Sequence, residues 1–140
     1  MKTGVKLAIT LLAFSVIGTA IGIAASLPYQ FGGIGDPARV SEEFVAKGTA
    51  ISPPLVGLIV LALALVLAIQ RGLVGRVGSG ALALLGAASL IPSFGEVMGA
   101  GAFSGPVYVF VVVWDLIGIA IILGMIAFGA REALSRSQTA

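Results

Sequence analysis

Four long apolar stretches dominate the sequence. They run over 5–27, 53–70, 77–94 and 106–130. A helix needs about 20 mostly apolar residues to cross the ~30 Å hydrocarbon core of a bilayer, and each stretch approaches or exceeds that length. Only 10% of the residues are charged, against about 25% in a soluble domain. The sequence therefore predicts an all-α integral membrane protein, with residues 1–140 forming one domain, an up-and-down bundle of four transmembrane helices.

The basic residues predict how these helices are oriented. Six of the eight flank span ends that would share one side of the membrane, and only Arg39 and Lys47 lie on the other. The six are Lys2, Lys6, Arg71, Arg76, Arg131 and Arg136. Cytoplasmic loops carry the excess of Lys and Arg, so we expect both termini in the cytoplasm and the protein in the plasma membrane. The first stretch is longer than the apolar part of a signal peptide, which favours a retained span.

The outer loop 28–51 is long enough to hold structure of its own. Asp36-Pro37 is typical of an N-cap followed by the first helical residue, and Gly48 is typical of a helix stop. A short helix over 37–47 is therefore predicted. Its charged and apolar side chains recur every four residues, so that neighbours can pair along one face. They form either a docking face for a partner or a cover on the bundle's own end. The residues concerned are Arg39, Val40, Glu43, Phe44 and Lys47.

Two further patterns concern the spans themselves. Ser52 is predicted to cap the second span with Pro53 at its first position, and Gly105-Pro106 to open the fourth. The segment Ala-Ala-Ser-Leu-Pro-Tyr-Gln-Phe-Gly at 24–32 is similar to Ala-Ala-Ser-Leu-Ile-Pro-Ser-Phe-Gly at 87–95. The chain is either two parallel copies of a helical hairpin, or the likeness reflects residues common in any membrane helix.

Asp115 is the acidic residue that lies well inside a predicted span. It follows Pro106 by nine residues, about 14 Å along a helix that rises 1.5 Å per residue. A charged residue near the bilayer middle costs about 2.5–3.5 kcal/mol to insert. Asp115 is therefore a proton- or cation-coupling group, a carboxyl hydrogen-bonded across a helix interface, or a group awaiting a basic residue of another subunit. Candidate hydrogen-bond partners at similar depth are Ser15, Thr19 and Ser89.

Small residues form a stripe along one face of the first span. Its members are Ser15, Gly18, Thr19, Gly22 and Ser26, and Ala120 and Gly124 offer a second contact in the fourth span. Small side chains let membrane helices approach closely. The stripe predicts packing within the chain's own bundle or, alternatively, a homodimer contact. Glu96, among several glycines after the third span, is expected to lie in a flexible turn.

The residue types narrow the function classes. The chain has no cysteine and no histidine, which removes thiol nucleophiles, imidazole acid–base chemistry and His-ligated metals. We expect no enzyme, no metal, no cofactor and no nucleic-acid partner; the expected partners are the lipid bilayer and another membrane protein or a second copy. The sequence favours an accessory or assembly subunit of a membrane complex. The alternative is a small oligomeric proton- or cation-coupled transporter that uses Asp115.

Overall fold

The computed structural model describes residues 1–135, of which 81% are helical and none forms a strand. The prediction of an all-helical chain is confirmed. In order along the chain the elements are α1 (Thr3–Ala24), the 3-10 turn η1 (Pro37–Arg39), α2 (Val40–Lys47), α3 (Leu55–Ile69), α4 (Gly72–Gly99), the 3-10 turn η2 (Ala100–Ala102) and α5 (Gly105–Leu134). Arg136, one of the basic residues used for orientation, lies outside the described residues.

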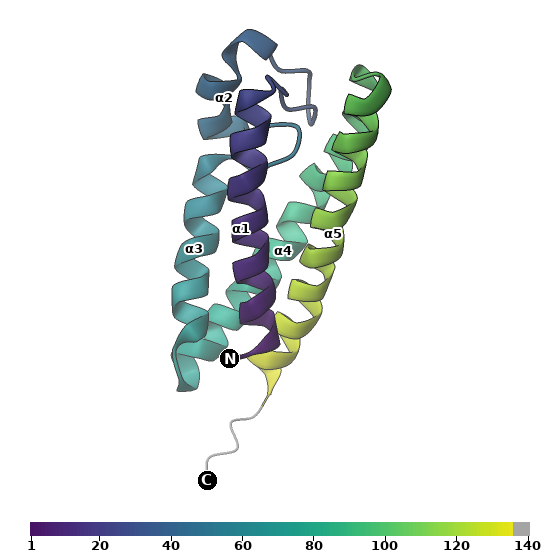
Figure 1. Cartoon of the computed structure of the whole chain (residues 1–140). Helices are drawn as coiled ribbons and strands as arrows, with labels where there is room; N and C mark the ends of the chain where they lie inside the picture. The colour runs from purple at the N-terminus through teal and green to yellow at the C-terminus, as the bar shows by residue number, and fades with distance from the viewer. Residues whose placement is uncertain (136–140) are drawn as a thin grey trace.

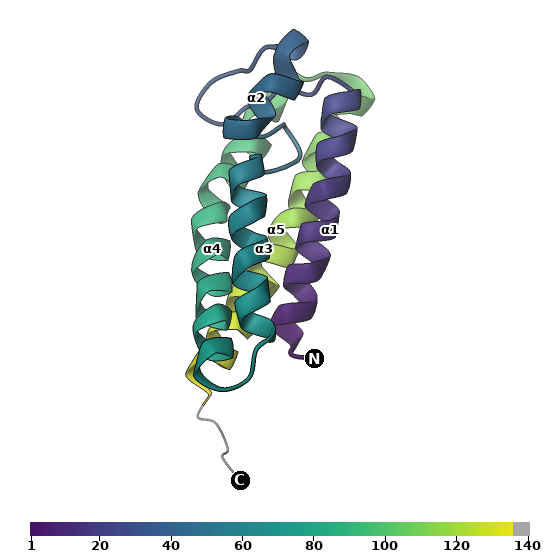
Figure 2. The same ribbon diagram turned by 90° about the vertical axis from the view of Figure 1, so that its left-hand side faces the viewer.

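The long helices α1, α3, α4 and α5 lie side by side, and α2 sits across one end of them (Figures 1 and 2). α1 packs against α3 and α5, and α4 packs against the same two helices from the other side. We call the end that holds the start of α1, the α3–α4 turn and the end of α5 the terminal end. The opposite end, where residues 25–54 connect α1 to α3 and include α2, is the cap end. These residues 25–54 are the cap segment.

The buried side chains form two clusters stacked along the bundle. The cluster near the terminal end draws on all four long helices, and Val5, Leu82 and Met125 are its largest almost fully buried members. The second cluster joins Ile51 of the cap segment to Val111 of α5 and Ala100 of η2. The cap segment therefore contributes to the core and is part of the bundle.

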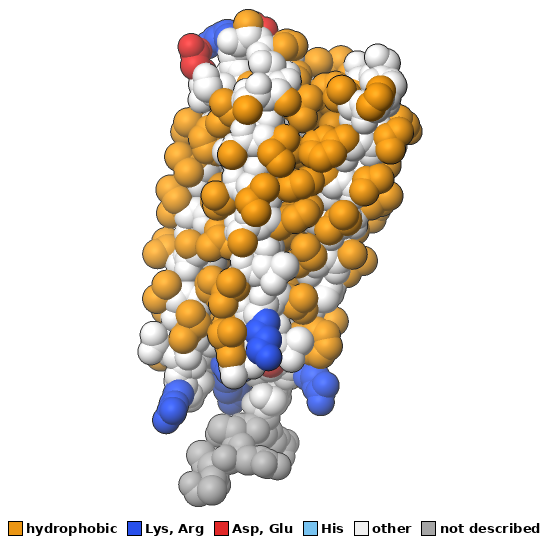
Figure 3. All heavy atoms as spheres, in the orientation of Figure 1, with side chains coloured by type: hydrophobic (Ala, Val, Ile, Leu, Met, Phe, Trp, Pro, Cys, Tyr) orange, Lys and Arg blue, Asp and Glu red, His pale blue; other side chains and the backbone are white. Residues whose placement is uncertain are grey.

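The outer surface of the helices is largely apolar (Figure 3). Among the described residues, α1, the combined α4–η2 element and α5 are long and apolar enough to cross a membrane. α3 is equally apolar but has 15 residues, about 22 Å at 1.5 Å per residue. Its shortness arises at its start. Ser52 does not cap it, because the helix begins at Leu55 after the two prolines.

The correction at Ser52 has a local cause. The residue before a proline is driven out of the helical region, so Pro54 keeps Pro53 from starting the helix. The Ser52 hydroxyl lies 2.9 Å from the Thr49 hydroxyl and forms a hydrogen bond with it. By contrast, α5 opens at Gly105 with Pro106 in its first turn, as predicted.

The third predicted span is longer than expected. It was placed at 77–94, with a proline near its exit, but α4 continues through Pro92 to Gly99. The hydroxyls of Ser89 and Ser93 donate to carbonyl oxygens one turn earlier, at 2.7 Å each. Proline is tolerated in helices where such side chains and neighbouring helices compensate. Residues 87–95 are thus helical, whereas their sequence counterpart 24–32 leaves the helix after Ala24.

The short helix of the cap segment lies where the sequence predicts it. The Asp36 side chain accepts a hydrogen bond from Ala38 N at 2.9 Å, and the chain then turns through η1 into α2. Gly48 ends the helix with a φ of 81°, a conformation that residues with a Cβ rarely adopt. Lys47 donates to the Tyr29 hydroxyl at 2.8 Å, and this bond raises the pKa of Lys47 because it favours the charged form.

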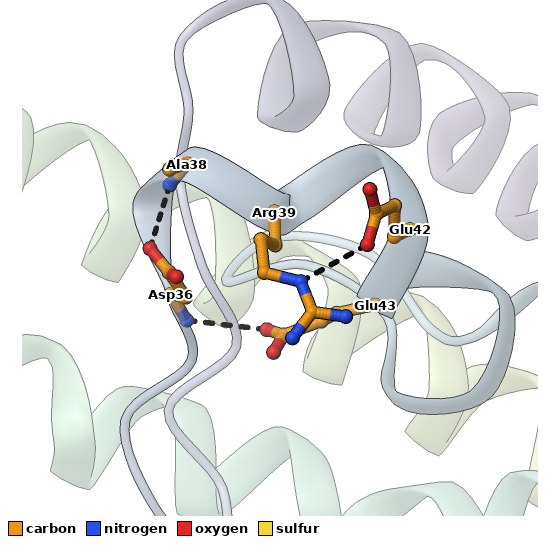
Figure 4. A network of polar contacts seen from close by, with 5 residues as sticks. All are labelled: Asp36, Ala38, Arg39, Glu42 and Glu43. Carbon is orange, nitrogen blue, oxygen red and sulfur yellow. Dashed lines mark hydrogen bonds and ion pairs between the residues drawn. The ribbon is translucent and has the colours of Figure 1, made fainter.

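The predicted charge pairing along α2 is wrong. Arg39 contacts Glu42 three residues on, at 3.0 Å, rather than Glu43 four residues on (Figure 4). Glu43 instead accepts a hydrogen bond from Asp36 N at 3.2 Å, which joins α2 to the extended residue before η1. The Asp36 N–H group takes the Glu43 carboxylate as its acceptor, so Arg39 does not pair with Glu43 four residues on.

Candidate functional site

The intramembrane acid predicted from sequence faces the interior of the bundle. Asp115 lies in the helical row that contains the buried side chains Val111, Ile119 and Ile122. Its Oδ2 is buried and has no hydrogen-bond partner among the described residues. Glu96 of α4 lies close enough for its charge to act on Asp115. Two carboxyl groups that are distant in the sequence therefore share one region of the cap-end half.

The hydroxyl groups predicted to bind Asp115 do not do so. Thr19 donates to the Ser15 carbonyl oxygen at 2.9 Å, and Ser89 donates to that of Leu85 at 2.7 Å. Hydroxyls in helices commonly bond to the carbonyl four residues earlier, and here that local bond takes precedence over a contact between helices. The predicted hydrogen-bond network around Asp115 is wrong.

Glu96 belongs to α4 and fastens the cap segment to it. Its Oε2 accepts a hydrogen bond from Gln30 N at 2.7 Å, and its Oε1 accepts one from Phe31 N at 3.0 Å. Bonds between backbone N–H groups and a carboxylate are among the stronger protein hydrogen bonds. The expectation of a flexible turn at Glu96 is wrong, because its side chain holds a segment 65 residues earlier.

Two glycines make room for this contact. A Cβ on Gly99 would lie 2.6 Å from the Gln30 Cβ, and one on Gly95 would overlap the Phe31 ring. Gly95, Glu96 and Gly99 occupy one side of the last turns of α4, so the loop seats directly on the helix backbone. We call these three residues, with Gln30 and Phe31, the Glu96 clamp. In the sequence, the signal that could have predicted this clamp is an acidic residue with a glycine just before it and another three residues after it.

An aromatic group lies beside the small-residue stripe of α1. The Phe14 and Trp114 rings stack with centroids 4.2 Å apart. A Cβ on Gly18 would lie 3.0 Å from Trp114 Nε1, and one on Gly22 would lie 2.5 Å from Thr49 Oγ1. Both glycines of the stripe are thus buried against the chain's own α5 and cap segment.

Ala120 and Gly124, the small residues predicted to form a second contact, lie in different surroundings. Ala120 is exposed on α5. A Cβ on Gly124 would lie 3.1 Å from Leu7 of α1. Only Gly124 therefore lies at a helix–helix contact within the chain.

Charged side chains close the terminal end, and sequence reasoning missed this arrangement. Lys2 donates to one carbonyl oxygen near the end of α3 and to one in the first turn of α4, at 3.2 and 3.3 Å. Glu132 Oε1 accepts from Gly4 N at 2.9 Å, and Arg76 donates to the Ala133 carbonyl oxygen at 3.0 Å. Lys2 at the end of α3, Glu132 at the start of α1 and Arg76 at the end of α5 each cap a helix end with the sign that suits its dipole. These are the cross-helix caps. The second bond of Lys2, in the first turn of α4, joins that helix to α3 without such a benefit.

The predicted docking face on α2 is only partly open. Val40 is 3% exposed and packs into the protein, and Phe44 and Glu43 are half-buried. Arg39 is exposed and paired with Glu42. The inward-facing part of the set covers the bundle end, so these residues do not present one continuous surface.

Two cavities are lined by residues other than Asp115. Each has a volume of about 270 Å³. One lies at the terminal end beside Lys2, and the other lies at the cap end between Leu27 and Phe110. Within residues 1–135, no three acidic side chains gather in a way that could hold a metal ion. No protein-family model, curated protein or solved structure matches this chain significantly.

Proposed function

We propose that this chain crosses the bilayer four times and serves as an accessory or assembly subunit of a membrane complex. α3 is the fourth span in this proposal. Its outward side chains are apolar throughout, with Val56, Leu63 and Val66 each more than half exposed. Such a face is suited to lipid and not to water. Because α3 is short, the cap segment that precedes it provides the rest of the crossing at that end.

The distribution of basic residues supports an orientation with both termini in the cytoplasm. Most of the described basic residues lie at the terminal end (Figure 3), and Arg39 and Lys47 lie at the cap end. Those at the terminal end are Lys2, Lys6, Arg71, Arg76 and Arg131. An excess of Lys and Arg is typical of the cytoplasmic side. The plasma membrane is the proposed location.

One observation supports the assignment as a subunit: the helices are tied together at both ends and packed between them. The cross-helix caps join the helices at the terminal end, and the cap segment, held by the Glu96 clamp, lies over the other end. Between them the interior is filled by side chains such as Leu82 and Val111, both fully buried. A conduit needs a polar passage, which this packing does not provide. What remains for a function is the outer face of the helices, where another membrane protein can bind.

The test is purification of a tagged chain from its native membrane in mild detergent, with mass spectrometry of stoichiometric companions. Leu84 of α4 and Leu63 of α3 are matched exposed leucines on different helices, 73% and 61% exposed. We expect a recurrent companion protein. One of the two single variants, Leu84→Trp or Leu63→Trp, should lose it, and the other should keep it. A lone species, or a companion indifferent to both substitutions, contradicts the proposal.

A second candidate is a small oligomeric transporter coupled to protons or cations. It is favoured by the inward position of Asp115, since intramembrane acids commonly serve ion or proton pathways. The test is ion flux into vesicles that contain the purified protein. Loss of flux in Asp115→Asn, with folding retained, supports this function; unchanged flux, or no flux in the parent protein, excludes it.

A further inference from the structure

We propose that the loop between α1 and η1 is a lipid-contacting wedge, in which Phe31 and Ile34 enter the boundary between headgroups and acyl chains of the outer leaflet. The proposal rests on the four-span membrane arrangement proposed above and adds a second membrane contact outside the spans. It concerns residues 31–35, which lie at the cap end of the bundle (Figure 2).

The apolar surface of the loop is exposed and adjoins that of α4. Ile34 is 70% exposed and Phe31 45% exposed; such side chains are informative where they extend a larger exposed apolar surface. Phe31 lies against Gly95. The neighbouring α4 side chains Phe94 and Met98 are 48% and 85% exposed. The surface that faces acyl chains on α4 therefore continues onto the loop, so the same lipids are the occupant.

The Glu96 clamp sets the depth of the loop. Gly95 precedes the last residue of α4 by four positions, about 6 Å along the helix axis. Phe31 is therefore held below the end of α4 rather than above it. Because Glu96 grips the backbone of residues 30 and 31, the loop cannot rise into the water without breaking two hydrogen bonds.

The backbone of the loop keeps it at the interface and out of the hydrocarbon. Gly35 N donates to the Tyr29 carbonyl oxygen at 2.9 Å, which closes the loop on itself. The N–H groups of Gly32, Gly33 and Ile34 have no acceptor among the described residues, and all three residues are exposed. Unpaired backbone groups are not tolerated in hydrocarbon, so these amides require headgroups or interfacial water. Apolar side chains beside wet backbone fit the interface.

Single cysteines can test the position, because the chain contains none. Spin labels at Ile34→Cys, Ser41→Cys and Leu84→Cys are compared in lipid nanodiscs that hold one copy each. Ser41 is exposed on α2 and reports water, and Leu84, 73% exposed in the middle of α4, reports acyl chains. Power saturation with oxygen and with a water-soluble nickel chelate then gives the collision rates of each label.

We expect the label at 34 to collide with the nickel chelate several-fold less often than the label at 41, and with oxygen more often. Glu96→Gln in the same background is expected to raise the nickel collisions at 34. If the labels at 34 and 41 behave alike, the wedge is refuted. Protection of 34 that appears only in discs with two copies assigns the surface to a second chain and also refutes it. If the label at 84 is water-accessible, the four-span proposal itself fails.

Discussion

Gly78 and Gly80 of α4 offer a matched test of how closely α3 and α4 pack. A Cβ on Gly78 would lie 2.6 Å from the Ala68 Cα, where ordinary contacts begin at 3.4 Å. The obstacle is backbone, which cannot rotate away, so the helices must separate by close to 1 Å. A Cβ on Gly80 would meet only the Ala133 Cβ, at 3.6 Å. The two positions thus differ in the space around them and share a helix.

The expected difference follows from two terms. Each Gly→Ala change gains about 0.8–1 kcal/mol in helix propensity, and this term cancels between the two variants. Overpacking costs about 1–3 kcal/mol and applies to Gly78→Ala alone. We therefore expect Gly80→Ala to unfold at higher denaturant than the parent, and Gly78→Ala to have a folding constant about 5- to 140-fold below that of Gly80→Ala.

The assay is equilibrium unfolding in mixed micelles of a mild detergent and dodecyl sulfate. Trp114 is the only tryptophan in the chain and stacks on Phe14, so its fluorescence reports on tertiary packing. Equal midpoints for the two variants would refute the reasoning. They would mean that α3 and α4 do not approach at Gly78 as described, since only that contact distinguishes the two glycines.

Two further substitutions test the ends of the bundle. Glu96→Gln keeps the size of the side chain but loses the charge that both N–H groups share, at a cost of about 1.5–3 kcal/mol; amide exchange at Gln30 and Phe31 should accelerate while exchange in the middle of α4 is unchanged. Lys2→Met removes two hydrogen bonds at the terminal end and should lower the unfolding midpoint by the equivalent of about 1–3 kcal/mol. The exposed Lys6→Met serves as its control, and equal effects of the two would exclude a capping role for Lys2.

Local signals predicted the helices of this protein well. Asp36 and Gly48 delimit the short helix because a cap and a left-handed residue act within a few positions. The positions of the long helices follow from runs of apolar residues. The failure at the second span is also local, because Pro54 restricts the residue before it. The failure at the third span is not, because α4 continues through Pro92 where neighbouring helices support it.

The site was less predictable, because its contacts join distant parts of the chain. Glu96 and Phe31 are 65 residues apart, and the sequence near Glu96 does not predict which distant residue it binds. Asp115 was identified from its depth in a span, but its expected hydroxyl partners bond within their own helices. A side chain's choice between a local and a distant partner depends on the packing angle of the helices, which apolar periodicity does not determine.

The bond between Gly4 and Glu132 spans 128 residues and so constrains the order in which the chain can fold during synthesis. At ~5–20 residues per second, roughly 6–26 s separate the emergence of the two residues from the ribosome. During that interval the start of α1 lacks its cap. The first helix must therefore wait for the last, and its capping bond can form only after residue 132 has been translated.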